Sequence, residues 1–383
     1  MANIQYFSFE CRTYKQRRME IFKKKDNSMY TLDDTDKIKK IDQARMYEVI
    51  YDFPSQFEDG LKRAKEAKLP SWDKNQIRNI VVAGLGGSAI GGDLVRSYLA
   101  EKINIPFLIC RNYTLPHFVD SSSLVFVSSY SGNTEETLSA FEDALRRKAK
   151  VICMTSNGKV EEISVKEKIP YVKLPKGFQP RAALGYSFVP ILVLLDSLGY
   201  VKGEETNIRK AKEFLEENKK KYRIEIDVEK NPAKKLAIKL HRKLPIIYAS
   251  NDHFDAVSTR WKGQFCENAK MLAFNNVFPE FNHNELVGWK VLSDYRDDLI
   301  VVILKDKEDH PSIKRRMEIV RGIIEKLKVE VIEEESSGEN LLSRMFSLIQ
   351  LGDFTSFYLA ILNEEDPSPV KVIDFLKSEL AKE

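Results

Sequence analysis

The sequence is poor in cysteine and lacks the spacings that make cysteine a disulfide or metal-binding residue. Its four cysteines, Cys11, Cys110, Cys153 and Cys266, lie far apart, with no CxxC pair and no Cys/His pattern typical of zinc. Widely separated thiols in a large chain are typical of a reducing cytoplasm. We therefore expect a cytoplasmic protein with neither a disulfide framework nor a zinc site.

Long hydrophobic segments are also scarce. The longest apolar stretch runs from about Phe188 to Leu195, far short of the ~20 residues that cross a bilayer. The N-terminus has no apolar segment typical of a secretory signal. We therefore expect neither a membrane span nor a signal peptide.

Outside the N-terminus, the chain has almost no excess of charge of either sign. The net charge of +4 comes from 61 basic and 57 acidic residues, and residues 1–25 alone contribute seven basic and two acidic side chains. The rest of the chain is therefore almost neutral, which argues against a nucleic-acid groove, because such a groove needs a clustered basic face. We expect residues 1–28 to be a disordered basic extension.

From residue 79 onward, short β-branched segments alternate with helical patterns. Continuous apolar strands separated by helices are typical of a parallel sheet covered on both faces. We expect strands at residues 80–83, 105–110, 124–127, 151–154, 246–248, 298–304 and 329–333, and helices at 88–100, 134–147, 181–198, 254–268, 313–328, 340–362 and 367–380. The predicted class is α/β, with two similar halves that indicate a structural duplication.

The same pattern predicts the domain organisation. A helical segment at residues 29–78 precedes a first α/β domain at 79–200. A charge-dense helical connector at 201–243 leads to a second α/β domain at 244–365. Residues 366–383 form the C-terminal helix, with Pro367 near its start, where helices favour proline.

A glycine-rich loop follows the first predicted strand, with the sequence Gly84-Leu-Gly-Gly-Ser-Ala-Ile-Gly-Gly92. Glycines let the backbone approach a ligand closely, and the following helix offers unpaired N–H groups to an anion. The pattern also fits a dinucleotide fingerprint, but the second strand ends in Cys110-Arg111-Asn112 instead of the acid that binds ribose. An NADP-dependent oxidoreductase that uses Arg111 therefore stays open as an alternative.

A hydroxyl-rich loop follows the third strand and contains Ser129, Ser131 and Thr134 at the start of a helix. Hydroxyls and helix-end amides are neutral donors that suit a phosphate group. No Walker sequence is present, so magnesium-dependent nucleotide binding is not expected. Ordinary helix capping is the alternative, but capping needs one hydroxyl and this loop has three.

Two further segments contain candidate catalytic groups. Glu267 and His283 form a possible acid/base pair in a polar-aromatic stretch, although His283 could equally lie on the surface as a helix cap. Arg181 follows Pro180 at a helix start, where a cation is unfavourable unless it faces an anion. A surface salt bridge of Arg181 is the alternative.

Together, four segments resemble the bifunctional phosphoglucose/phosphomannose isomerases, a family found largely in archaea and part of the sugar-isomerase (SIS) superfamily. The segments are GLGGSAIGGD, SSYSGNTEET, PRAALGYSF and ENAK…NVFPEFNHNELVGW, and they occur in the family's order. The glycine and hydroxyl loops alone would indicate only an SIS domain. The block from Glu267 to His283 narrows the resemblance to this family.

The resemblance implies two SIS domains, each with a parallel five-stranded sheet, and a homodimer with its active site at the subunit interface. It also implies the conversion of fructose 6-phosphate to glucose 6-phosphate and mannose 6-phosphate, with neither a metal nor another cofactor. No nucleic-acid or membrane partner is implied. A sugar-phosphate sensor without catalysis stays open as a second alternative.

The resemblance also assigns roles to individual residues of this sequence. Ser129, Ser131 and Thr134 would hold the phosphate, and Gly86, Gly87 and Ser88 would complete the sugar-phosphate pocket. Glu267 would be the base that moves a proton between C1 and C2. The partner subunit's His283, together with Lys377, would open the sugar ring. Arg181 is a candidate to stabilise charge that develops on oxygen, because a guanidinium stays charged and carries several donors.

Overall fold

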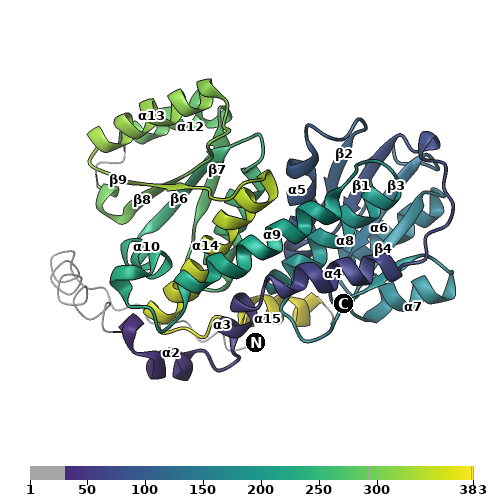
Figure 1. The fold of residues 1–383 in the computed structure, drawn as a ribbon, viewed down its shortest axis with the longest axis horizontal. Helices are drawn as coiled ribbons and strands as arrows, with labels where there is room; N and C mark the ends of the chain where they lie inside the picture. Colours follow the sequence, from purple (N-terminus) through teal and green to yellow (C-terminus); the bar gives the residue numbers. More distant parts are fainter. Residues whose placement is uncertain (1–30, 292–293, 381, 383) are drawn as a thin grey trace.

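The computed structural model describes residues 31–291, 294–380 and 382, so the predicted disorder of residues 1–28 falls outside the described part of the chain. Two parallel sheets lie in two separate lobes, with helices packed between and around them (Figure 1). The fold is therefore α/β with two similar halves, as the alternating pattern predicts.

The first sheet contains five parallel strands in the order β2-β1-β3-β4-β5. These strands are β1 (Asn79–Ala83), β2 (Phe107–Cys110), β3 (Ser123–Ser128), β4 (Lys150–Thr155) and β5 (Tyr171–Lys173). Every residue of β1 and β3 is buried, which explains their continuous apolar sequences. The helices that follow these strands are α5 (Gly86–Leu99), α6 (Glu135–Arg146), α7 (Gly158–Lys166) and α8 (Leu184–Ser197).

The second sheet contains four parallel strands in the order β7-β6-β8-β9. They are β6 (Leu244–Ser250), β7 (Phe274–Phe278), β8 (Leu299–Lys305) and β9 (Glu330–Glu335), and the helices beside them are α10 (Pro232–Leu240), α11 (Asp255–Glu267), α13 (Pro311–Lys326) and α14 (Leu341–Leu362). The expectation of five strands in each sheet is therefore wrong for this half, within the part that the structure describes.

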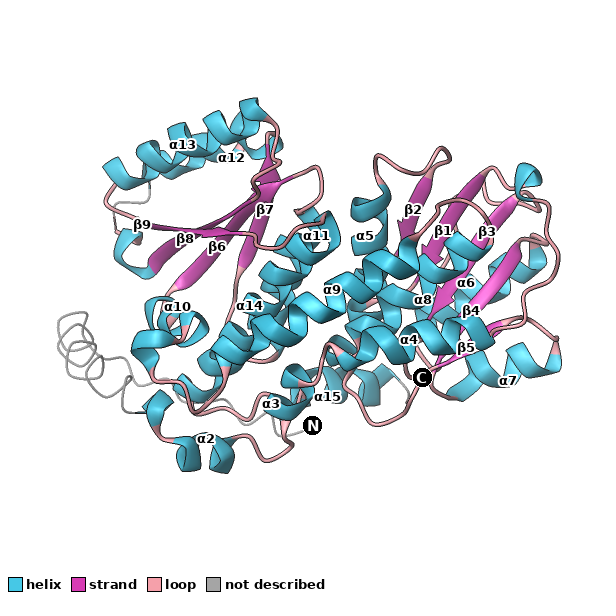
Figure 2. Cartoon of the chain, in the orientation of Figure 1, coloured by secondary structure: helices cyan, strands magenta, loops and turns pink. Residues whose placement is uncertain are grey.

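The helices of the N-terminal segment and of the connector lie between and below the two lobes in the view of Figure 2. The N-terminal segment forms α2 (Thr35–Ile41), α3 (Met46–Tyr51) and α4 (Ser55–Glu66), and the charge-dense connector forms α9 (Glu204–Asn218). Helix α4 packs against α8, whereas α9 packs against α14. The chain ends in α15 (Lys371–Leu380), which begins four residues after Pro367.

Helix α14 runs through the core, although its composition alone could also fit a membrane. Within the described residues it is the one helix that is long and apolar enough to span a bilayer, and in this structure its apolar stretch is entirely buried among other helices. The longest continuous apolar stretch is still the one near Phe188, as expected from the sequence, because polar residues separate the apolar segments of α14. Buried polar side chains, among them Arg344, Gln350 and Asp353, lie within this largely apolar helix.

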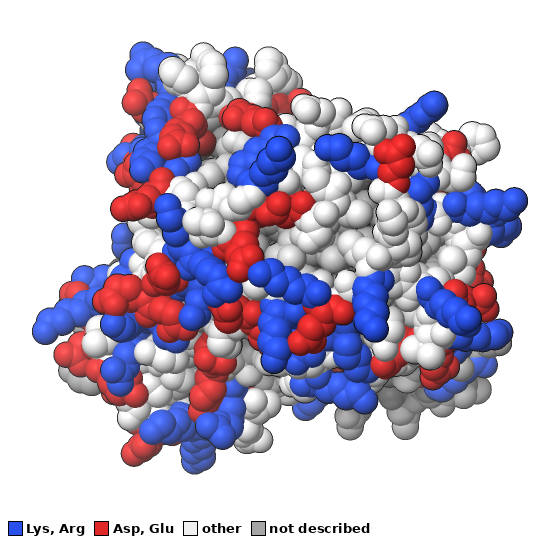
Figure 3. Space-filling model, turned by 45° about the vertical axis from the view of Figure 1, so that its right-hand side comes forward, with Lys and Arg blue, Asp and Glu red and all other residues white. Residues whose placement is uncertain are grey.

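All seven strands expected from the sequence are present, with ends that shift by at most two residues. Strands β5 and β7 and helix α7 are not in the sequence-based prediction, because β5 has only three residues and β7 contains two asparagines. On the face seen in Figure 3, acidic and basic side chains are interspersed over the lower part and no large patch carries one sign. This distribution agrees with the nearly neutral body of the chain.

Candidate active site

Two loops meet at the carboxyl edge of the first sheet. From β1 the chain first adds β2 on one side and then crosses to add β3 on the other side, so the order of the strands switches between β1 and β3. Ligands of doubly wound sheets bind at such a switch point. Ser128 Oγ donates to the Ser88 carbonyl at 3.0 Å, and Tyr130 N donates to Ser88 Oγ at 3.1 Å. The glycine-rich and hydroxyl-rich loops are thus joined through Ser88.

The first turn of α5 has no side-chain cap. Leu85 occupies the N-cap position and supplies no acceptor, and Gly86, with φ +49°, is exposed. The start of this 14-residue helix therefore presents unpaired amides and the positive end of its dipole beside the hydroxyl loop.

The hydroxyl loop places two of its three predicted ligands in contact. Ser129 is buried and donates its Oγ to Thr134 Oγ1 at 3.2 Å. Thr134 is the N-cap residue of α6, but its side chain makes no capping hydrogen bond. Ser131 is exposed, and its Oγ accepts a hydrogen bond from Asn133 N at 3.4 Å. Capping by Thr134 therefore does not account for this cluster of hydroxyls.

Arg181 lies in the 3₁₀ turn η2 (Pro180–Ala182), and its side chain is only 3% exposed. Its Nε donates to Asn268 Oδ1 at 2.6 Å, and its Nη2 donates to the carbonyls of Pro367 and Ser368 at 2.7 and 2.8 Å. Nη1 lies 3.4 Å from Glu267 Oε2. Arg181 is thus buried and faces the partly exposed carboxylate of Glu267, so it does not form the surface salt bridge left open by the sequence.

Glu267 is the last residue of α11 and stays partly accessible, with its side chain 32% exposed. A pocket of about 190 Å³ lies beside it and is lined by Gly86, Gly87, Arg181 and Glu267 among others. Burial lowers the pKa of Arg181, while the charge of Glu267 opposes that shift. The pocket therefore brings a carboxylate and a buried guanidinium to the start of α5.

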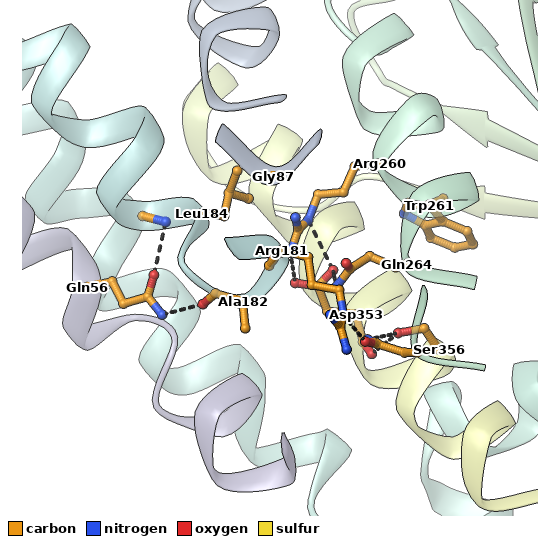
Figure 4. A network of polar contacts seen from close by, with 12 residues as sticks. Gln56, Gly87, Arg181, Ala182, Leu184, Arg260, Trp261, Gln264, Asp353 and Ser356 are labelled. Atoms are coloured by element: carbon orange, nitrogen blue, oxygen red, sulfur yellow. Dashed lines mark hydrogen bonds and ion pairs between the residues drawn. The ribbon is translucent and has the colours of Figure 1, made fainter. Parts of the chain in front are cut away.

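A buried polar network fixes the turn that contains Arg181 (Figure 4). On one side, Gln56 donates to the Ala182 carbonyl at 2.7 Å and accepts from Gly185 N at 3.0 Å. On the other side, Arg260 donates to the Arg181 carbonyl at 3.1 Å. The turn is thus held both by α4 and by the second domain.

The same network continues into the core helix. Arg260 forms a two-point ion pair with Asp353 at 3.1 and 2.6 Å, and Gln264 Nε2 donates to Asp353 Oδ1 at 3.0 Å. Burial raises the pKa of Asp353, and Arg260 acts in the opposite direction. Sequence reasoning missed these residues, although their spacing from Glu267 on α11 places Arg260 and Gln264 on the same helical face.

Two predicted catalytic residues lie away from this pocket. His283 is exposed in the 3₁₀ turn η5 (Glu280–His283), and Lys377 is exposed in α15, whose described residues are all exposed. Neither side chain lines the pocket beside Glu267. Within one chain, the structure therefore does not bring together the pair Glu267 and His283.

Arg111 and Lys270 complete the charged surroundings. Arg111 lines the pocket and is ion-paired with Asp93 of α5, so the guanidinium that an NADP site would need is already engaged. Lys270 Nζ donates to the carbonyls of Glu267 and Pro367 at 2.6 and 3.1 Å. Desolvation, together with the nearby charge of Arg181, lowers the pKa of Lys270 to about 8. Among the described residues, no cluster of His, Cys, Asp and Glu is arranged to hold a metal ion.

Comparisons with known proteins agree with this architecture. Residues 75–164 match the SIS domain family, and residues 229–380 match the bacterial phospho-glucose isomerase C-terminal SIS domain. The chain is 44% identical over 337 residues to a bifunctional phosphoglucose/phosphomannose isomerase of Caldicellulosiruptor bescii, covering 88% of this chain and 99% of that protein. It is 34% identical over 305 residues to the protein of the same name from Thermoplasma acidophilum, covering 79% and 90% of the two chains.

A solved structure shares the fold. The glucose-6-phosphate isomerase like protein from Thermus thermophilus superposes with a TM-score of 0.59 at 19% identity, covering 91% of this chain and 98% of that chain. With this fold, and with identities of 34–44% over most of the chain, the protein belongs to the bifunctional phosphoglucose/phosphomannose isomerase family and is built from two SIS domains.

Proposed function

We propose that this enzyme interconverts fructose 6-phosphate with glucose 6-phosphate and with mannose 6-phosphate, through a cis-enediol and without a metal ion. The observation that carries the proposal is the pairing of Glu267 with the buried Arg181 in a pocket that begins at the uncapped end of α5. Relatives that bear the name bifunctional phosphoglucose/phosphomannose isomerase support the choice of substrates.

The phosphate binds where neutral donors gather. The amides at Gly86 and Gly87, together with the hydroxyls of Ser88, Ser129 and Thr134, surround the start of α5, and Ser131 lies on the same loop. A dianion at this position is favoured by the helix dipole and by unpaired N–H groups. The sugar then extends from this end of α5 toward Glu267.

The reaction moves one proton between neighbouring carbons. With glucose 6-phosphate in its open form, Glu267 removes the proton from C2, and the electron pair forms the C1–C2 double bond while the carbonyl oxygen at C1 gains a proton. Glu267 then returns its proton to C1, while the C2 hydroxyl loses a proton that replaces the one taken up by the oxygen at C1, and C2 becomes the carbonyl carbon of fructose 6-phosphate. Arg181 stabilises the negative charge that develops on the oxygens during this transfer.

The two residues to which the family resemblance assigns ring opening do not line this pocket within the described part of one chain. His283 and Lys377 are exposed and lie outside it, so we assign the His283 contribution to a second copy of the chain in a homodimer. The test uses a mixed dimer that contains one Glu267→Gln chain and one His283→Ala chain. One of its two sites then has both native residues, so about half of the wild-type activity should return. A mixed dimer as inactive as its parents would contradict the shared site.

The activity itself is tested on EDTA-treated enzyme with fructose 6-phosphate in deuterated water. We expect both aldose phosphates to form and deuterium to appear at C2. Glu267→Gln should lower kcat by at least about 10²- to 10⁴-fold while ligand binding persists. Glu142→Gln, on the exposed face of α6, is the matched control and should act as wild type. Strict dependence on added metal, or full activity of Glu267→Gln, would refute the mechanism.

A further inference from the structure

Arg260 is a second buried guanidinium at the same pocket. It lies on α11, seven residues before Glu267, and two helical turns place both side chains on one face of the helix. Gln264 lies between them on this face. All three residues line the pocket, although the Arg260 side chain is only 3% exposed.

The ion pair of Arg260 leaves one of its nitrogens available. Nε and Nη2 donate to the two oxygens of Asp353, and Nη2 also donates to the Arg181 carbonyl. Among the hydrogen bonds of the described residues, none involves Nη1. Because the guanidinium is planar and rigid, pairing through Nε and Nη2 directs Nη1 away from Asp353. Figure 4 shows Arg260 reaching from α11 toward the turn of Arg181.

Stability is a weak reason for such a pair. The charges of Arg260 and Asp353 are almost completely removed from water, and apolar residues of similar volume often serve a core as well or better. Asp353 is held by three donors, two from Arg260 and one from Gln264, so the orientation of the guanidinium is fixed before any ligand arrives. A rigid donor prepared in this way suits recognition of a ligand oxygen.

We propose that Arg260 is a further substrate-binding residue, which donates from Nη1 to an oxygen of the sugar, in the part of the pocket between the start of α5 and Glu267. This inference rests on the proposed function, because it takes the ligand to be a hexose phosphate. Arg260 recognises the sugar and not the phosphate, which binds at the amides and hydroxyls described above. Asp353 and Gln264 are positioning residues that act through Arg260.

The test compares two Arg→Lys variants by calorimetry, with fructose 6-phosphate and inorganic phosphate as separate ligands. Arg260→Lys keeps the charge but cannot pair with Asp353 at two points and also reach the sugar. We expect its affinity for fructose 6-phosphate to fall at least about tenfold, as for loss of a hydrogen bond from a charged donor, while its affinity for inorganic phosphate stays near wild type.

Arg344→Lys is the matched control. Arg344 is equally buried and is paired with Asp306 at 2.9 Å, but it does not line this pocket. This variant should bind both ligands as wild type does. Should Arg260→Lys fail to fold, the double variant Arg260→Met/Asp353→Asn removes both charges, and the amide oxygen of the new side chain at position 353 can still accept the hydrogen bond from Gln264. This variant should show the same selective loss of affinity for the sugar phosphate.

The outcomes separate the two proposals. Equal losses for fructose 6-phosphate and inorganic phosphate, or an Arg260→Lys variant that matches Arg344→Lys, would overturn the role of Arg260 and leave the proposed function standing. A wild-type protein that neither binds nor isomerises fructose 6-phosphate would instead overturn the proposed function.

Discussion

Replacing Gly87 with alanine should strongly lower the activity of the enzyme by displacing Arg181. A Cβ at position 87 would lie 2.5 Å from the Pro180 carbonyl and 2.6 Å from Arg181 N, whereas ordinary contacts begin at 3.4 Å. The start of α5 and the turn that contains Arg181 must therefore move apart by close to 1 Å. The turn cannot yield freely, because Gln56 holds it from α4 and Arg260 holds it from α11.

The expected magnitude follows from this displacement. Overpacking of this kind costs about 1–3 kcal/mol of stability, and a misplacement of about 1 Å in a catalytic group can lower the rate by about 10²-fold. We expect Gly87→Ala to lower kcat/KM for fructose 6-phosphate by about two orders of magnitude, measured by coupling glucose 6-phosphate formation to its dehydrogenase.

Gly322→Ala is the control for this experiment. Gly322 lies inside α13, away from the pocket, and a Cβ there would meet nothing within 4 Å. This variant should keep full activity and gain about 0.5–1 kcal/mol of stability, because alanine favours the helix. The reasoning fails if Gly87→Ala keeps kcat/KM within about threefold of wild type in the same assay.

Three further predictions concern the polar groups around the turn. Gln56→Leu leaves a buried carbonyl and a buried N–H without partners, so the unfolding free energy from urea titration should fall by about 2 kcal/mol or more, and an unchanged value would refute the bracing role of Gln56. Asp353→Ala leaves the buried charge of Arg260 without its partner and should lower the unfolding free energy by about 3–5 kcal/mol in the same measurement, more than the exposed control Glu142→Ala. Lys270, whose pKa is lowered to about 8, loses its charge above that pH, so its rate of acetylation by acetic anhydride should rise with pH around 8. The labelling of this residue is measured by mass spectrometry. A rate that rises only near the ordinary lysine pKa of 10.5 would contradict the desolvation of this side chain.

The local sequence was enough to predict most of the fold. Strands such as β1 and β3 are buried at every position, so their apolar character survives in the sequence without any helical periodicity. Strand β7 could not be predicted in this way, because it lies at the edge of its sheet and begins with the exposed Phe274 and two partly buried asparagines. Its place in the sheet depends on pairing with β6, which is a long-range contact.

The residues of the candidate site also differ in whether the local sequence could indicate them. Gly86, Gly87, Arg181 and Glu267 were candidates because a glycine-rich loop, a cation at a helix start and a carboxylate in a polar-aromatic stretch are visible locally, and these four residues line one pocket. Arg260 and Asp353 were missed because they come from two helices whose packing no local pattern reveals. A polar residue in the apolar helix α14 is the signal that could have indicated a partner across the core.

Arg181 shows why the two halves of this chain must work as one unit. Its backbone belongs to the first half, where Gly87 and Gln56 contact its turn, yet its guanidinium is held by Asn268 and by the carbonyls of Pro367 and Ser368. The segment that precedes α15 therefore contacts the same side chain that faces Glu267. Any displacement of Pro367 and Ser368, or of Asn268, relative to the turn of Arg181 must break hydrogen bonds of a buried cation, and such bonds are costly to leave unmade. The position of the stabilising charge relative to the base is thus set by the packing of the whole chain and not by one loop.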